Sequence, residues 1–117
     1  MASAQISNFR VVITVPPDLG KPDGMTIDAE GTLWVALWDG GCVGRWDPQS
    51  GRLLETLAVP ARRVTSCAFG GPGIEDLYIT TARVGLTQSD LALQPHAGGL
   101  FLDRPGVRGV PAFEFAG

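Results

Sequence analysis

The sequence repeats a pattern of four short segments at an interval of 42 residues, measured from Met25 to Cys67. The matching pairs are GMTID (24–28) with SCAFG (66–70), TLWVAL (32–37) with DLYITT (76–81), GGCVG (40–44) with GGLFL (98–102), and LLETLAV (53–59) with PAFEF (111–115). A repeat of about 40–45 residues is typical of a four-stranded propeller blade. The repeat therefore restricts the chain to a small set of architectures built from equivalent β units.

Each repeated segment is a short β-rich run that ends at a turn signal. Helical periodicity is nearly absent, apart from one short helical turn expected at 89–93. In DPQSG (47–51), Pro48 presets φ for a turn and Gly51 accepts a positive φ, so the flanking runs can pair antiparallel. The predicted strands are Phe9–Val15, Met25–Asp28, Thr32–Leu37, Cys42–Trp46, Arg52–Val59, Ser66–Phe69, Asp76–Ala82, Gly99–Leu102 and Pro111–Phe115. The sequence thus predicts an all-β fold of meandering antiparallel sheet.

Residues 1–117 are interpreted as one partial β-propeller domain of about two and a quarter four-stranded blades. Its parts are the outer strand of a preceding blade (5–17), a first full blade (22–60), and a second full blade (64–117) with an insertion at 82–98. A blade buries its faces against its neighbours, propellers close rings of about 4–8 blades, and neither end of the chain resembles a cap. We therefore expect a fragment, an assembly of copies, or a partner chain that supplies the missing blades.

Composition and charge exclude several classes of partner. Nine basic and twelve acidic residues give a net charge of −3, so the sequence lacks the excess of positive charge that would bind nucleic acid or an anionic membrane. No apolar run approaches the ~20 residues of a membrane span, and MASAQISNFR (1–10) lacks the apolar core of a signal peptide. Cys42 and Cys67 lack metal-ligand spacing and cannot form a disulfide framework, so we expect small buried thiols and a cytoplasmic protein.

Five longer strings carry a family resemblance: PDGMTIDAEGTLWVA (22–36), GGCVGRWDPQSGRLLETLAVP (40–60), TSCAFGG (65–71), DLYITTA (76–82) and AGGLFL (97–102). Together they resemble the senescence marker protein, regucalcin and gluconolactonase family of six-bladed propellers, and most closely its regucalcin members. The strings keep their order and spacing. The resemblance covers essentially this whole chain but only the C-terminal part of a family member.

The resemblance implies a divalent metal at the top of the central channel and hydrolysis of sugar lactones. The family holds its metal with a glutamate, an asparagine and the aspartate of a PDG motif, and that aspartate is Asp23 here. Such oxygen ligands suit calcium or magnesium, and manganese or zinc also occupy these sites. In the family the metal polarises the lactone carbonyl for attack by water, and the aspartate can help move the proton. Asp23 is thus the candidate metal ligand and catalytic residue, with a turn role as the alternative.

The glutamate and asparagine positions of the family are expected to precede residue 1. The leading hypothesis is therefore the C-terminal part of a divalent-metal-dependent sugar lactonase, which alone binds metal weakly because affinity grows with the number of charged ligands. Its partners are a small-molecule lactone and either the missing blades or a second copy of the chain. The alternative is a non-catalytic calcium-binding regulatory or truncated propeller module that oligomerises through open blade edges, including a smaller ring of two copies with two Asp23 residues at its axis.

Other polar residues are assigned structural roles. Asp28 and Glu30 are expected in a solvated hairpin turn, as are Asp47 and Gln49. His96, the only histidine, is expected at the surface of the insertion. A catalytic pair with His96 would need a nucleophile held next to it, and Ser89 and Thr87 are only near it in sequence.

The aromatic residues and two hydroxyl residues complete the set of candidates. Trp38 is the candidate for a channel-side role, and Thr65 and Ser66 occupy the place equivalent to the PDG motif, where hydroxyls are candidates to line the channel. The recurrence of the other aromatic residues at matching blade positions favours a core between blades for Trp34, Trp46, Tyr78 and Phe101.

Overall fold

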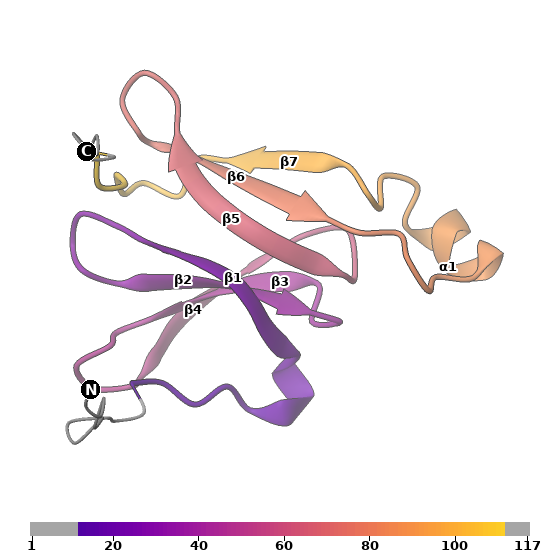
Figure 1. Ribbon diagram of the computed structural model, residues 1–117, viewed down its shortest axis with the longest axis horizontal. Coiled ribbons are helices and arrows are strands. Elements are labelled where there is room, and N and C mark those ends of the chain that lie inside the picture. Colours follow the sequence, from indigo (N-terminus) through magenta and orange to yellow (C-terminus); the bar gives the residue numbers. More distant parts are fainter. Residues whose placement is uncertain (1–11, 112–117) are drawn as a thin grey trace, which may run out of the picture.

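The computed structural model describes residues 12–111, which form two antiparallel sheets lying face to face (Figure 1). The first sheet contains, in spatial and chain order, β1 (Lys21–Ile27), β2 (Leu33–Trp38), β3 (Cys42–Trp46) and β4 (Leu53–Ala58). The second sheet contains β5 (Val64–Gly70), β6 (Asp76–Thr81) and β7 (Leu100–Asp103). A short 3-10 turn, η1 (Pro17–Leu19), precedes β1, and helix α1 (Gln88–Leu93) lies between β6 and β7. The all-β prediction is confirmed.

The strand ends depart from prediction where the backbone pairs across an irregularity. β3 has its predicted bounds, but β1 begins at Lys21 rather than Met25, because Lys21 and Pro22 already pair with β2 on the far side of a register shift. The predicted helical turn is α1, which begins one residue earlier than expected. It follows the N-cap residue Thr87, which forms a capping box with Asp90.

The third strand corrects the alignment of the two repeats by one residue. The matching strings place Phe101 at the position of Val43, but Phe101 lies opposite Ile79 just as Gly44 lies opposite Val35. Phe101 is therefore equivalent to Gly44. Since a shift of one residue turns a strand side chain to the other face of its sheet, the correction decides which side chains of β7 face the first sheet.

The ends of the predicted propeller segment lie partly outside the described residues. Residues 12–15 form no strand. Instead, Ile13 and Val15 pack on the outer face of the first sheet. Residues 5–11 and 112–117 lie outside the described range, so the preceding-blade strand and the last strand of the second blade stay predictions.

A buried apolar cluster joins the two sheets. Trp34 and Val43 of the first sheet and Leu77 and Ile79 of the second are all at most 2% exposed within it. The rings of Trp34 and Phe69 meet edge to face across the interface, with centroids 5.9 Å apart. Of the predicted core aromatics, Trp34 is fully buried between the sheets, and Trp46 is fully buried in a second cluster on the outer face of the first sheet. Tyr78 and Phe101 are half-buried.

A later segment of the chain also ties the sheets together. The N–H of Ala29 donates to the carbonyl of Arg108 (2.7 Å), and the N–H of Gly109 donates to the carbonyl of Ile74 (2.8 Å). The segment after β7 thus spans from the β5–β6 loop to the β1–β2 turn. Within residues 12–111, no helix has the length and apolarity needed to cross a membrane.

Both cysteines are free and buried, as predicted. Burial raises the pKa of the Cys42 thiol and raises that of Cys67 to about 12. Because thiolates are the reactive form, both thiols are expected to react with an aromatic disulfide reagent at pH 8 only as fast as the protein unfolds. Absorbance of the released thiolate measures this rate with and without urea. Fast labelling of Cys67 in the native protein would contradict its buried position.

Candidate functional site

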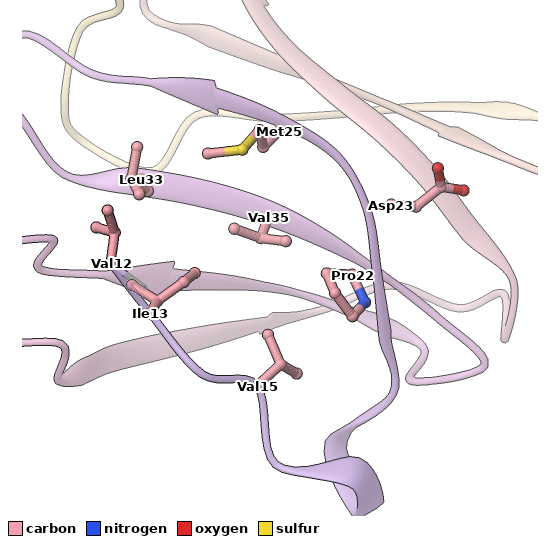
Figure 2. Close-up of a pocket in the computed structure, with 8 residues that line it drawn as sticks. All are labelled: Val12, Ile13, Val15, Pro22, Asp23, Met25, Leu33 and Val35. Carbon is pink, nitrogen blue, oxygen red and sulfur yellow. The ribbon is translucent and has the colours of Figure 1, made fainter. Parts of the chain in front are cut away.

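Asp23 lies near the start of β1, the first strand of the first sheet. Pro22 pairs with Leu37 and Met25 with Val35, and the register shifts between these two pairs. Asp23 and Gly24 therefore sit in a β-bulge, a device that re-aims a side chain out of the regular alternation. Figure 2 shows the Asp23 carboxylate pointing away from the apolar side chains beside it. The residue is exposed, and its carboxylate takes part in none of the ion pairs or side-chain hydrogen bonds formed among residues 12–111.

The first strand of the second sheet lies directly against this bulge. A Cβ placed on Gly24 would lie 2.6 Å from the Cβ and 2.9 Å from the Cα of Ser66, so only glycine allows this approach of β1 to β5. β5 carries its own register shift, between Val64 and Ser66, which places Thr65 at a matching bulge. The structure thus brings together Asp23 and the two hydroxyl residues predicted to share its end of the channel.

The Thr65 hydroxyl already has a partner within the second sheet. The Oγ1 atoms of Thr65 and Thr80 lie 2.7 Å apart, and the Thr80 hydroxyl is 3.5 Å from the carbonyl of Ser66. A lining role for Thr65 and Ser66 stays a prediction.

Two arginines fasten the neighbouring loops at the same end of the sheets. Arg63 Nε donates to Asp39 Oδ1 (2.9 Å), and the Arg63 guanidinium lies 5.1 Å above the ring of Trp38. The backbone N–H of Arg62 donates to Gln94 Oε1 (2.7 Å), which ties the insertion at 82–98 to the β4–β5 loop. Trp38 is therefore covered by Arg63, and its channel-side role stays a prediction.

Asp28 corrects the expectation of a solvated turn. It is 1% exposed, whereas Glu30 is exposed as expected. Asp28 Oδ1 accepts from the N–H groups of Glu30 (2.9 Å) and Thr32 (3.0 Å). Asp28 Oδ2 accepts from the Thr32 hydroxyl and the Trp34 indole (2.8 Å), and lies 3.4 Å from Arg45. The carboxylate is a buried structural hub. The turn packs against Trp34 and excludes water, so these protein donors replace the water that would otherwise bind the carboxylate.

A buried hub of this kind has a weak sequence signal. The only hint is an Asp that opens a turn and is followed after four residues by a hydroxyl and after six by an indole, and this pattern also fits an ordinary exposed turn. His96 is exposed in the insertion, as predicted.

The described residues do not make a complete metal site. Among residues 12–111, no group of three or more His, Cys, Asp or Glu side chains is placed to hold a metal ion. Asp23 supplies one carboxylate, and calcium takes about 6–8 oxygen ligands and gains affinity with each charged one. A divalent cation at Asp23 would need ligands from outside this part of the chain.

Known proteins are similar to this chain in sequence and in the arrangement of their sheets. Residues 1–83 match the model of the SMP-30/Gluconolactonase/LRE-like region. Regucalcin of Danio rerio is 50% identical over 113 residues, which cover 96% of this chain and 38% of the relative. This chain thus spans about two fifths of the length of the curated relatives it matches.

Two solved structures have the same fold. A calcium-binding protein, regucalcin, from Agrobacterium tumefaciens superimposes with a TM-score of 0.80 at 34% identity, over 86% of this chain and 34% of that one. A luciferin-regenerating enzyme superimposes with a TM-score of 0.75 at 36% identity, over the same shares. These similarities confirm the partial-propeller prediction. The chain belongs to the SMP-30/gluconolactonase/LRE-like family.

Proposed function

We propose that the chain forms the C-terminal part of a divalent-metal-dependent sugar lactonase of the gluconolactonase and regucalcin type. The observation that carries the proposal is the carboxylate of Asp23, which has no side-chain partner among residues 12–111 and lies in a bulge of β1 where that strand meets β5. Family membership supports the lactonase class, and the calcium-binding relative supports a divalent cation.

Asp23 is assigned two tasks in this proposal. It contributes one oxygen ligand to a divalent cation (calcium, magnesium, manganese or zinc) whose remaining ligands come from blades beyond the described residues. It is also the candidate acceptor for the proton of the attacking water, since it has no partner among residues 12–111 that would hold it in another role. Water adds to the lactone carbonyl carbon, the ring C–O bond breaks, and the product is a hydroxy acid that releases a proton at neutral pH.

The Asp23→Asn substitution tests the proposal in an assembled propeller. The 117-residue chain is co-expressed with the N-terminal part of the Danio rerio regucalcin that it does not cover. Acidification of a sugar-lactone solution with added manganese or calcium is expected from the pair, and Asp23→Asn is expected to lower its rate by at least tenfold, the scale of losing a metal-site contact. Calcium titration by calorimetry should show a matching loss of affinity.

Asp18→Asn is the matched control. Asp18 is an exposed acid of η1, only five positions earlier in the chain, and its substitution is expected to leave turnover unchanged. Full activity of an Asp23→Asn pair would overturn the assignment of Asp23. A calcium-dependent rise in Tm without turnover in the wild-type pair would instead favour the non-catalytic calcium-binding module.

A further inference from the structure

The pair of sheets has two outer faces with exposed apolar side chains. The leading face, on the first sheet, consists of the exposed Met25 and Ile27. It also includes Leu33 and Val35, against which Ile13 and Val15 already pack. The trailing face, on the second sheet, consists of Tyr78, Thr80, Leu100 and Leu102. Isolated exposed apolar residues need no explanation, but neighbouring ones gathered on a sheet face mark an interaction surface.

The leading face repeats the side of the second sheet that is buried against the first. Met25 lies opposite Val35 in the first sheet, and Cys67 lies opposite Ile79 in the second, so Met25 and Cys67 are equivalent. Cys67 is 4% exposed because the first sheet covers it, whereas Met25 is 52% exposed.

The trailing face repeats the other side of the same interface. Leu100 lies opposite Thr80, just as Val43 lies opposite Ala36, so Leu100 and Val43 are equivalent. Val43 is 0% exposed between the sheets, whereas Leu100 is 64% exposed. Residues 12–111 therefore present, on two sides, the two halves of an interface that they already make once internally.

We propose that the trailing face of one copy of this chain packs on the leading face of a second copy, and so continues the packing between the first and second sheets. The occupant of each face is another copy of the same chain, because the partner that fits each face is already present in the sequence. This proposal rests on the inter-sheet packing and concerns the chain without the missing blades, which would occupy the same two faces in the lactonase proposal.

The leading face has room for the side chains that the trailing face presents. A groove of about 380 Å³ runs between residues 12–15 and strands β1 and β2, with Met25, Leu33 and Val35 on its floor (Figure 2). Leu100 and Leu102 are alternate residues of β7 and so project from the same side of that strand. Insertion of both leucines into the groove would bury apolar surface on both copies.

The contact is head to tail, which has consequences for the assembly. A head-to-tail contact generates a closed ring or an open filament, depending on whether the rotation closes. Each copy supplies two sheets, and propellers close with about 4–8 blades, so a closed ring takes about two to four copies. In a ring, the Asp23 residues of all copies lie at the same end of one channel.

Face-specific variants test the proposal by their masses in solution. Light scattering over a dilution series should give the wild type a mass of at least twice the 12.3 kDa of one chain. Leu100→Glu with Leu102→Glu, and separately Met25→Glu with Ile27→Glu, should each give a monomer, because each variant lacks one half of the contact. An equimolar mixture of the two variants should give a dimer, since one intact leading face and one intact trailing face remain.

Val84→Glu with Leu93→Glu is the matched control, because these exposed apolar residues lie in the insertion outside both faces. It should assemble like the wild type, and circular dichroism should show all variants folded. A folded wild-type monomer at every concentration would overturn the proposal, and would mean that another segment covers the faces. Assembly of either face variant alone would also overturn it, because a face that pairs with itself needs no second face.

Discussion

Replacement of Asp28 by alanine is expected to lower the free energy of unfolding by about 3–5 kcal/mol, the usual cost of removing one partner of a buried charge pair. The substitution removes the acceptor of the Trp34 indole N–H and of the Thr32 hydroxyl, both in the β1–β2 turn region. It also leaves Arg45, whose side chain is 13% exposed, without its most buried partner. Urea unfolding followed by far-UV circular dichroism measures the loss.

Asp47→Ala provides the matched control in the β3–β4 turn of the same sheet. Asp47 also accepts local hydrogen bonds, from the N–H of Gln49 (3.0 Å) and the hydroxyl of Ser50 (2.9 Å). These groups face solvent, so water replaces the lost acceptor and the destabilisation is expected to be much smaller. Equal losses for the two alanine variants would show that Asp28 acts only as a turn residue.

Acid unfolding tests the stabilising role of the Asp28 carboxylate independently. Burial alone raises the pKa of Asp28, but hydrogen bonds from Thr32, Trp34 and Glu30 outweigh burial and lower the pKa below its usual value of 3.8. A lowered pKa in the folded state means that the stabilisation is complete above 3.8 and disappears as the pH falls through the folded value. The Asp28→Ala variant is therefore expected to lose less stability than the wild type on acidification below about pH 4.

The strands could be predicted from the sequence because their signals are local. β3 lies between two turns whose glycines adopt positive φ, Gly41 (62°) and Gly51 (76°), and β4 begins after the second of these turns. The burial of Asp28 could not be predicted in this way. It depends on the packing of Trp34 against the second sheet, which no short window of sequence contains.

The same distinction between local signals and contacts between distant segments applies to the candidate site. The PDG motif predicted the position of Asp23 at the start of an inner strand, and the register shift in β1 shows how the backbone accommodates it. The contact of Gly24 with Ser66 joins residues 42 positions apart, so the repeat shows that they are equivalent but not that they touch. The further ligands that the proposed metal site needs would come from blades outside the described residues, and nothing in the local motif specifies them.

Gly24→Ala is expected to lower the free energy of unfolding by about 2–3 kcal/mol, at the upper end of the usual cost of overpacking. The added methyl group would lie 2.9 Å from the Cα of Ser66, and a backbone atom cannot move aside as a flexible side chain can. The sheets must then separate locally, which also shifts the bulge that carries Asp23. Urea unfolding measures the cost.

A double-mutant cycle with Ser66→Gly separates this contact from any intrinsic effect of alanine in β1. Ser66→Gly removes the Oγ and Cβ that crowd Gly24 and leaves only the Cα, so the double variant is expected to recover part of the loss. Alanine favours the strand backbone over glycine, so a residual loss in the double variant reports the remaining backbone contact. If Gly24→Ala is as stable as the wild type, β1 and β5 do not meet at this point, and Asp23 is not held where these two strands meet.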